Sequence, residues 1–342
     1  MIKGTFMRFG IIGCGMISSV HAGAVRAIDS AELVGACDMN IDRCRTFAAE
    51  YGIAAYDSYE ALLSDKNIDA VCICTPSGSH AANAVQAAEA GKHIVIEKPM
   101  ALTADSADEI ISACRKNNVT GTVISQLRYS ADITKVRDAV NDGSFGKLVS
   151  CHLEMRYYRT QAYYDGSSWR GTWAMDGGGA LMNQGIHGID AMSYIMGGIA
   201  SVSGVIKTIC RNIEVEDTAA AAVCFKNGAV GTINGSVATY PGYPRRLVIS
   251  GSLGSVELTE EIMTYSDLPA FTDHKLSDGS IGSGSSDPTN TPIYGHVRQL
   301  TDFIQAVKNN TKTRSDILDG RDTVKIIESI YKSSRTGMRV EI

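Results

Sequence analysis

The first 125 or so residues alternate between short apolar runs and longer amphipathic segments, and this alternation restricts the fold more than any other feature. The apolar runs lie at 8–13, 31–38, 69–74, 93–96 and 119–124. The segments between them, at 16–29, 41–50, 79–90 and 103–117, have the spacing of helices that bury one face. Such an alternation predicts parallel βαβ units and a doubly wound, Rossmann-type α/β sheet.

The pattern changes after residue 128. A helical segment at 131–141 leads to a long strand at 147–156, an aromatic loop at 157–173 and a helix at 177–196. Strands joined by tight turns then predict an antiparallel or mixed sheet; they lie near 201–210, 216–225, 229–238, 245–250 and 254–258. We expect a mobile loop at 277–291 and two final helices, at 292–310 and 317–335. These features divide the chain into domains 1–127 and 128–342.

Composition agrees with two domains and narrows the function. The 342 residues are 44% hydrophobic, and 32 basic against 37 acidic side chains give a net charge of −5. We therefore expect no nucleic-acid partner, because a negative net charge gives no overall attraction to phosphate backbones. No apolar run approaches the roughly 18 residues of a membrane span, and no export signal is seen, so we expect a cytoplasmic protein without a membrane partner.

The nine cysteines indicate neither disulfides nor a metal site. None of them forms a C-x-x-C pair, and Cys72 and Cys74 alternate along one strand rather than forming a metal knuckle. We interpret the cysteines as small, reduced, buried side chains and predict no metal.

A glycine turn follows the first predicted strand. Residues 13–18 read Gly-Cys-Gly-Met-Ile-Ser and open the first helix. Gly13 permits a tight turn, and Gly15 lets the backbone approach a pyrophosphate at the helix N-terminus. Ser18 replaces the usual third glycine or alanine but is small enough for close packing. In this strand–turn–helix context the motif predicts dinucleotide binding.

An acid ends the second predicted strand. Asp38 lies 23 residues beyond Gly15, where a carboxylate accepts hydrogen bonds from ribose hydroxyls and repels a 2′-phosphate. This favours NAD over NADP, which remains possible because Arg43 is either a phosphate contact or a solvated helix residue. Thr75 and Pro76 end the third strand at the same edge. His80 either lines the cofactor site or sits in the first turn of its helix.

Glu97, Lys98 and Pro99 follow the fourth strand. A lysine at the end of a core parallel strand is costly to bury, so we expect it to face the cofactor crevice. Pro99 restricts Lys98 to extended geometry and allows a cis bond. Partial desolvation lowers the pKa of such a lysine towards neutrality, which suits a general acid/base.

A second cluster spans residues 176–190. Gly177, Gly178 and Gly179 precede a helix in which Asn183 and His187 are four residues apart and so share a face. Asp190, three residues after His187, could orient the His187 ring. Either this face holds a polyol by hydrogen bonds, or His187 is a satisfied core histidine.

Taken together, these motifs resemble the glucose–fructose oxidoreductase / inositol dehydrogenase (Gfo/Idh/MocA) family over essentially the whole chain. The resemblance implies a Rossmann domain and a second domain with a large, mostly antiparallel open sheet that usually forms a homo-dimer or homo-tetramer interface. It implies that Lys98 is the proton donor/acceptor and His187 its partner. Many inositol-dehydrogenase-like members have Asp where this chain has Asn183, which puts inositol specificity in doubt.

The aromatic loop bears on the substrate. It holds both tryptophans of the chain and several tyrosines and arginines, among them Tyr157, Trp169 and Arg170. Aromatic faces suit sugar rings, and arginines suit carboxylates or phosphates. The alternative is a lid or a subunit interface.

We therefore predict an NAD(P)-dependent oxidoreductase that oxidises a secondary hydroxyl of a sugar, sugar derivative or cyclitol. The alternatives are an acidic or nucleotide-linked sugar as substrate, or a regulator that binds dinucleotide and sugar without chemistry. The predicted catalytic residues are Lys98 and His187. The predicted cofactor contacts are Gly13, Gly15, Met16, Ile17, Asp38, Arg43, Thr75, Pro76, His80, Glu97 and Lys98. The predicted substrate contacts are Lys98, Tyr157, Trp169, Arg170, Asn183 and His187.

Overall fold

The computed structural model describes residues 6–274 and 292–342 and divides the chain into two compact units. The first unit contains Met1–Gln126 and Thr291–Arg321, and the second contains Leu127–Asn290 and Asp322–Ile342. The chain first passes from one unit to the other between Gln126 and Leu127, next to the predicted boundary. The segment 291–321, which the sequence division places in the second domain, belongs to the first unit. The loop expected at 277–291 lies outside the described residues.

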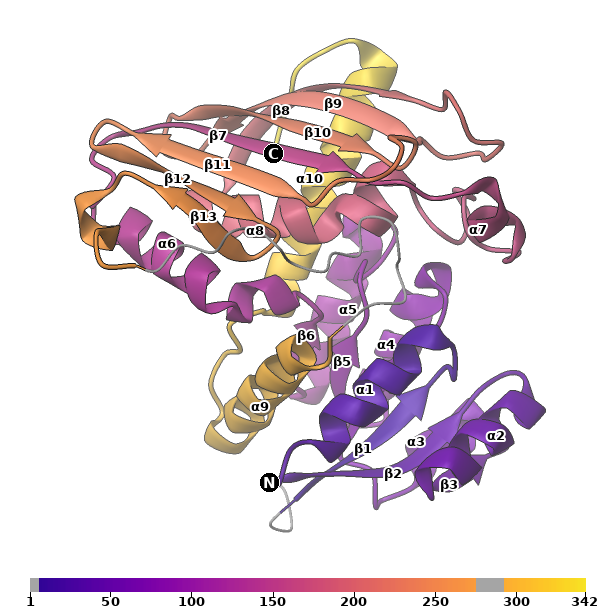
Figure 1. Cartoon of the computed structure of the whole chain (residues 1–342). Helices are drawn as coiled ribbons and strands as arrows, with labels where there is room; N and C mark the ends of the chain where they lie inside the picture. The colour runs from indigo at the N-terminus through magenta and orange to yellow at the C-terminus, as the bar shows by residue number, and fades with distance from the viewer. Residues whose placement is uncertain (1–5, 275–291) are drawn as a thin grey trace. The chain divides into compact units, whose positions relative to one another are not determined.

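The first unit contains a parallel six-stranded sheet in the order β3-β2-β1-β4-β5-β6 (Figure 1). Its strands are β1 (Met7–Ile12), β2 (Ala31–Cys37), β3 (Ala54–Tyr56), β4 (Ala70–Ile73), β5 (His93–Ile96) and β6 (Gly121–Val123). This order confirms the doubly wound sheet, with its switch point between β1 and β4. Strand β3 was not predicted, because its three residues are too few to show a periodic pattern.

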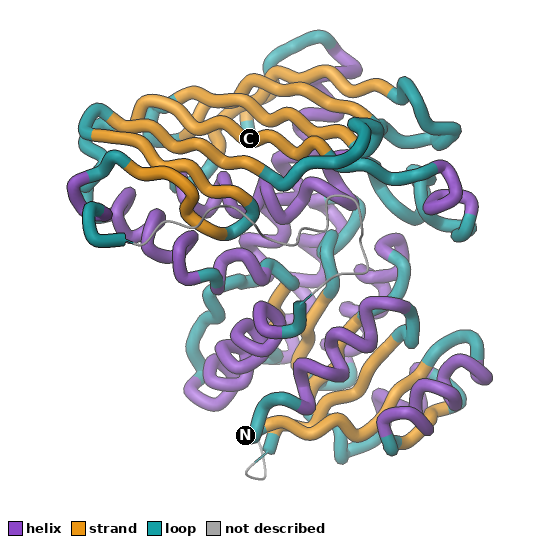
Figure 2. Tube along the Cα trace, in the orientation of Figure 1, coloured by secondary structure: helices purple, strands orange, loops and turns teal. Residues whose placement is uncertain are grey.

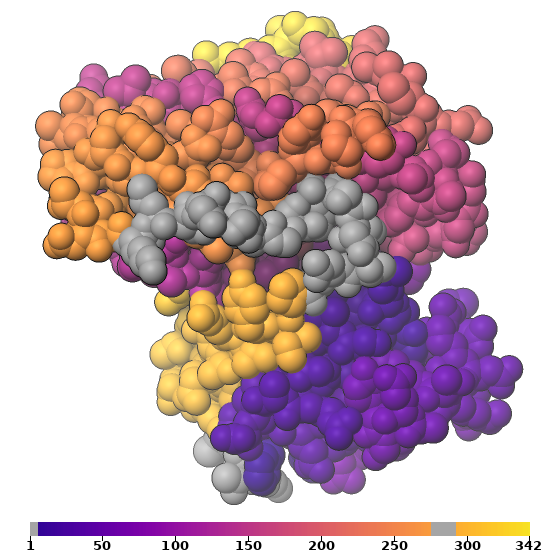
Figure 3. Space-filling model, in the orientation of Figure 1, coloured from indigo at the N-terminus to yellow at the C-terminus, as the bar shows by residue number. Residues whose placement is uncertain are grey.

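Helices cover both faces of this sheet. One apolar cluster joins the sheet to α1 (Met16–Arg26), α2 (Ile41–Tyr51) and α9 (Tyr294–Asn309). A second joins it to α3 (Tyr59–Ser64), α4 (His80–Glu89) and α5 (Ala104–Asn117). Figure 3 shows the orange-yellow residues of α9 packed on the indigo residues of α1. Phe303 of α9 meets Phe9 of β1 with ring centroids 6.3 Å apart, which is why 291–321 joins this unit.

The second unit contains an eight-stranded sheet in the order β13-β12-β11-β7-β10-β9-β8-β14 (Figure 2). Its strands are β7 (Leu148–Arg156), β8 (Ile199–Lys207), β9 (Thr218–Phe225), β10 (Val230–Ser236), β11 (Arg246–Gly251), β12 (Gly254–Thr259), β13 (Ile262–Ser266) and β14 (Val340–Glu341). Within the described ranges β7 and β10 are its one parallel pair, so the expected mostly antiparallel sheet is confirmed.

Helices pack on one face of this second sheet. They are α6 (Ala131–Asn141), α8 (Ile186–Met196) and most of α10 (Ile317–Thr336), while a short α7 (Gln161–Asp165) lies in the aromatic loop (Figure 1). The predicted helix at 177–196 begins later than expected, with a π-helical turn at Ala180–Gly185 ahead of α8. No helix in the described part of the chain is long and apolar enough to cross a membrane.

Candidate cofactor and active site

The two glycines of the β1–α1 turn have different physical requirements. Gly13 adopts φ +90°, and a Cβ atom there would lie 2.9 Å from the backbone of Cys74. A Cβ atom on Gly15, by contrast, would meet no protein atom within 4 Å. Packing therefore requires a glycine at position 13. The open space beside Gly15 instead suits the pyrophosphate of a dinucleotide at the helix N-terminus. Ser18 is fully buried, as expected for a close helix–strand contact.

Asp38 ties the end of β2 to this turn. One carboxylate oxygen accepts the Cys14 N–H at 2.8 Å, and the other accepts the Asn40 N–H at 2.7 Å. The Arg43 guanidinium lies 3.2 Å from Asp38 and is half exposed. Neither expectation for Arg43 included this ion pair. The neighbouring Met16 side chain is exposed at the start of α1, and Ile17 is partly buried.

His80 is buried and spans the ends of β4 and β5. Its ring nitrogens lie 2.7 Å from the Pro99 carbonyl oxygen and 2.8 Å from the Thr75 carbonyl oxygen. Burial lowers the pKa of His80, so the neutral ring donates one of these bonds at a time. Of the two expectations for His80, the geometry fits a helix-start residue that ties two strand ends together. Its contact with a cofactor stays a prediction.

Glu97 and Lys98 follow β5 at this same carboxyl edge of the sheet. Glu97 is 5% exposed, and its Oε2 accepts the backbone N–H of Lys98 at 3.0 Å. Lys98 is partly buried, and the Lys98–Pro99 bond is cis, as Pro99 allows. The first unit thus places Gly15, Asp38 and Lys98 after β1, β2 and β5, at the carboxyl edge of one parallel sheet, where doubly wound folds bind ligands.

Sequence reasoning missed a buried cluster around Glu97. His21 on α1 places Nε2 2.9 Å from Glu97 Oε1, and His296 on α9 places Nε2 3.7 Å from the same oxygen. These three groups offer metal-type donor atoms within 4.8 Å of one another. The 2.9 Å spacing is nevertheless that of a hydrogen bond, because tetrahedral ligands at 2.0–2.1 Å lie about 3.3 Å apart. No local motif could have signalled residues so distant in sequence.

In the second unit, Asn183 and His187 fall on either side of the change from π-helix to α-helix. Asn183 is buried, and its Nδ2 donates to Asp176 Oδ1 at 2.5 Å. His187 is partly buried on α8. That Asp190 orients His187 stays a prediction. Asp190 pairs with Arg128 at 2.6 and 2.9 Å and accepts the Thr323 hydroxyl.

The triple-glycine loop is held by an acid that the sequence did not signal. Glu216 is buried, and its carboxylate accepts the N–H groups of Gly179 and Leu181 at 3.0 and 2.8 Å and the Tyr331 hydroxyl at 2.9 Å. Gly179 lies so close to the Glu216 carbonyl oxygen that a Cβ atom would be 2.1 Å away. The glycines therefore also serve packing within this unit, in addition to any approach to a ligand.

The aromatic loop separates into buried and accessible parts. Tyr157 is buried in the core of the second unit, whereas Trp169 and Arg170 are partly exposed. The Arg170 guanidinium lies over the Tyr163 ring at 4.5 Å. The guanidinium of Arg211, from the loop after β8, lies over Tyr158 at 5.0 Å, and its Nε and one Nη have no hydrogen-bond partner among the described residues.

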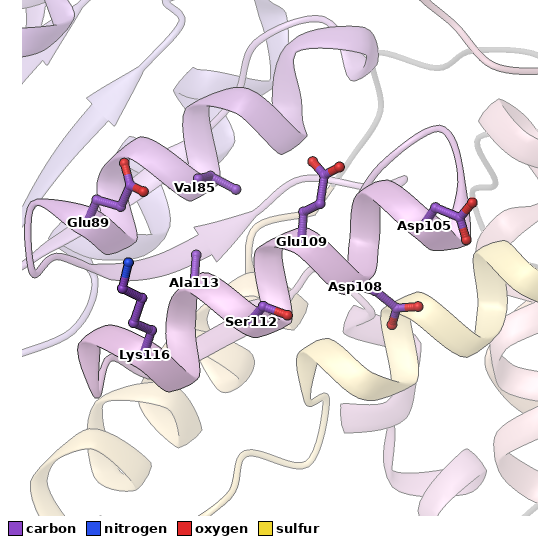
Figure 4. Close-up of a pocket in the computed structure, with 8 residues that line it drawn as sticks. All are labelled: Val85, Glu89, Asp105, Asp108, Glu109, Ser112, Ala113 and Lys116. Carbon is purple, nitrogen blue, oxygen red and sulfur yellow. The ribbon is translucent and has the colours of Figure 1, made fainter.

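A separate hollow lies between α4 and α5 on the first unit (Figure 4). Glu89, Asp105, Asp108 and Glu109 line it, with Lys116 at one end. Asp108 already pairs with Arg321 at 3.1 Å. Because four carboxylates repel a pyrophosphate, this hollow is a poor site for a dinucleotide.

Two family comparisons match most of the chain. Residues 7–125 match the oxidoreductase family with an NAD-binding Rossmann fold, and residues 133–257 match the GFO/IDH/MocA C-terminal domain. Over 256 residues, 73% of this chain and 74% of the relative, the sequence is 30% identical to the myo-inositol 2-dehydrogenase of Thermotoga maritima. This chain belongs to the Gfo/Idh/MocA oxidoreductase family. It is an NAD(P)-dependent oxidoreductase with NAD as its cofactor, as predicted.

Other relatives in this family share the whole length of the chain. The D-glucoside 3-dehydrogenase of Escherichia coli is 26% identical, with 98% of this chain and 97% of that protein covered. The WlbA dehydrogenase of Bordetella pertussis, solved with NADH and UDP-GlcNAcA, superposes with a TM-score of 0.90 at 32% identity. That comparison covers 100% of this chain and 99% of WlbA.

Proposed function

We propose that this oxidoreductase transfers a hydride from a secondary carbinol carbon of a sugar, sugar derivative or cyclitol, with Lys98 and His187 as its proton-handling groups. The observation that supports this most is the placement of Lys98 directly after β5. It lies on the sheet edge that carries the glycine turn, and its amide is held by Glu97. The relatives, which include inositol and glucoside dehydrogenases, favour such substrates.

The residues of the glycine turn, with Asp38, would hold the dinucleotide. NAD, when bound, supplies the hydride acceptor. Lys98 acts in its neutral form and takes the hydroxyl proton, and partial burial of its side chain favours that form. His187 is the second proposed proton-handling group.

Replacement of Lys98 tests this role directly. Lys98→Ala should lower kcat by roughly 10²–10⁴-fold, because general acid/base catalysis supplies about that factor. NAD affinity, measured by calorimetry, should change little. The control is Lys116→Ala, which removes an exposed lysine of α5 and should leave kcat unchanged. Full activity of Lys98→Ala would contradict the proposal.

A more specific candidate is an acidic or nucleotide-linked sugar. Within the described residues, no carboxylate pairs with the guanidinium groups of Arg170 and Arg211, and both have buried N–H groups without a partner. Guanidinium groups in this state fit a carboxylate or phosphate. The WlbA dehydrogenase, which binds UDP-GlcNAcA, is similar over its full length.

Arg211→Ala separates this candidate from a neutral substrate. KM for an anionic sugar should rise roughly 10–100-fold, since a hydrogen bond to a charged group contributes about 1.5–3 kcal/mol. Arg246→Ala is the matched control, because Arg246 pairs with Glu257 on the sheet. Initial rates with neutral sugars, uronic acids and sugar nucleotides provide the comparison. An equal effect on neutral and anionic sugars would exclude an anion contact.

We also propose that two or more copies associate through the uncovered face of the second sheet. Buried and exposed side chains alternate along β9, which leaves Ala220 and Ala222 exposed there. Val205, which pairs with Ala220, and Val230, which pairs with Cys224, are more than half exposed on the same face. Exposed apolar side chains gathered on one sheet face are typical of an interface.

A further inference from the structure

Three ionisable side chains meet in the interior of the first unit. His21, Glu97 and His296 are 0%, 5% and 1% exposed and come from α1, the end of β5 and α9. Two imidazoles and a carboxylate cost free energy to bury unless they satisfy one another. The proposed chemistry uses none of them, so their presence beside Lys98 requires a separate explanation.

The contacts of Glu97 point in two directions. Its Oε1 faces the two histidines, with His21 Nε2 at 2.9 Å and His296 Nε2 at 3.7 Å. Its Oε2 accepts the Lys98 amide N–H at 3.0 Å. The histidine rings are 5.2 Å apart and meet edge to face. Movement of the His21 ring would therefore displace the carboxylate that holds the Lys98 backbone.

We propose that His21 and His296 are positioning residues for Lys98: His21 holds and neutralises Glu97, whose second oxygen fixes the Lys98 amide, and His296 packs against His21 and Glu97. The proposal rests on the proposed role of Lys98 only for its effect on turnover. The Glu97–Lys98 backbone contact and the charge of the His21–Glu97 pair do not depend on that role. Neither histidine touches a substrate in this scheme.

The protonation of the cluster supports neutralisation. Burial alone would raise the pKa of Glu97, but the hydrogen bond to His21 and the proximity of both His21 and His296 bring it well below its usual value. Burial alone would lower the pKa of His21, yet Cys74, Cys72 and the hydrogen bond to Glu97 together bring it well above 6.5. Burial raises the pKa of the Cys74 thiol to about 11, so this thiol is neutral near pH 7. The charged partner of His21 at that pH is therefore Glu97. Burial lowers the pKa of His296.

The cluster is therefore a buried imidazolium–carboxylate pair, His21 with Glu97, beside a neutral His296. The other titratable groups that face it come from β4, the start of α4 and the residue after Glu97; they are Cys72, Cys74, His80 and Lys98. At pH 7 the pair contributes no net charge next to Lys98.

His21→Asn tests the proposal through Lys98 itself. Removal of the imidazolium leaves the Glu97 carboxylate uncompensated, and a nearby negative charge favours the ammonium form of Lys98. The pH midpoint for acetylation of Lys98, followed by peptide mass spectrometry, should rise by about one unit. His152→Asn, on an exposed strand histidine, should leave the midpoint unchanged.

Turnover provides the second measurement. His21→Asn should lower kcat roughly 10–100-fold with little change in the KM for NAD, since misplacement of a reacting group affects the chemical step. Glu97→Gln should retain more kcat than Glu97→Ala. Its amide oxygen still accepts the Lys98 N–H, and its NH₂ group donates to a neutral His21. This pair carries the test if His21→Asn does not fold.

The outcomes separate this inference from the proposed function. Full activity of Lys98→Ala with a shifted labelling midpoint would reject the catalytic role of Lys98 and leave the cluster's role intact. An unchanged midpoint in His21→Asn, or equal kcat values for Glu97→Gln and Glu97→Ala, would overturn the inference. So would one zinc ion per chain retained after gel filtration and lost in His21→Asn, because the cluster would then be a metal site.

Discussion

The contact with Asp176 explains why position 183 holds an amide. Asp176 is fully buried, accepts the Gly171 N–H at 2.8 Å and accepts the Asn183 amide at 2.5 Å. Where many relatives are expected to have a carboxylate at this position, this chain pairs an amide with a neighbouring carboxylate. One negative charge is thus kept in the loop.

Asn183→Asp would place two carboxylates in contact, which disfavours ionisation of both. One of the pair would have a raised pKa in the folded state, so the free energy of unfolding should fall as the pH rises from about 4 through that raised pKa. We expect a loss of about 1–3 kcal/mol at pH 8 and a smaller loss at pH 5. Urea unfolding at the two pH values measures it. Asn227→Asp, in a surface turn, is the control, and an equal loss at both pH values would contradict the explanation.

At the residue scale, the sequence predicted those site residues that stand in a recognisable local pattern. Gly13, Gly15 and Lys98 each stand at a strand end, where a residue type that is costly elsewhere signals a purpose. Glu216 and His296 have no such setting. Glu216 precedes an ordinary strand, and His296 joins Glu97 only because α9 packs against α1. Long-range packing, which no short window contains, determines these two positions.

The β1–α1 turn shows how one element combines folding and binding requirements. A side chain at Gly13 would meet the Cys74 backbone at 2.9 Å and would need a backbone conformation that L residues rarely adopt. A side chain at Gly15 meets no protein atom within 4 Å.

Alanine substitutions should therefore have different effects at the two glycines. Gly13→Ala should lower the free energy of unfolding by about 1–3 kcal/mol. Gly15→Ala should change it by less than about 1 kcal/mol but weaken NAD binding, because the methyl group occupies the space of the pyrophosphate. Thermal unfolding and calorimetric titration with NAD measure the two quantities. Unchanged NAD affinity in Gly15→Ala would place the pyrophosphate elsewhere.

Elements were predictable in proportion to their length and regularity. The long alternations of the first unit were found, whereas β3 and the six-residue α3 were not. The helix that follows the glycines was expected from 177 but starts with a π-helical turn at 180. Gly178 adopts φ +156°, and Gly179 is held at Glu216, which together prevent an earlier start. That constraint comes from a distant strand.

For the whole molecule, the division of the chain into two units was the least predictable feature. A boundary near 127 follows from the change in pattern. The return of 291–321 to the first unit does not, because α9 has the amphipathic pattern of a helix that could cover either sheet. Its partners on β1, among them Phe9, decide the matter.

Self-association is the prediction that belongs to this scale. If the uncovered face of the second sheet is an interface, Val205→Lys combined with Val230→Lys should convert the assembly to monomers, since buried lysines repel across it. Sedimentation velocity measures the mass. Leu253→Lys, at an exposed leucine in the turn after β11, should leave the mass unchanged. A wild-type protein that sediments as a monomer would refute the interface.

The position of α9 also has a consequence for biosynthesis. Nascent chains emerge at about 5–20 residues per second, so roughly 10–40 s separate the appearance of residue 126 from that of α9. During this interval α9 is missing from the sheet face that it shares with α1 and α2, and His296 has not yet reached Glu97. The dinucleotide site would thus mature only after most of the second sheet has been synthesised.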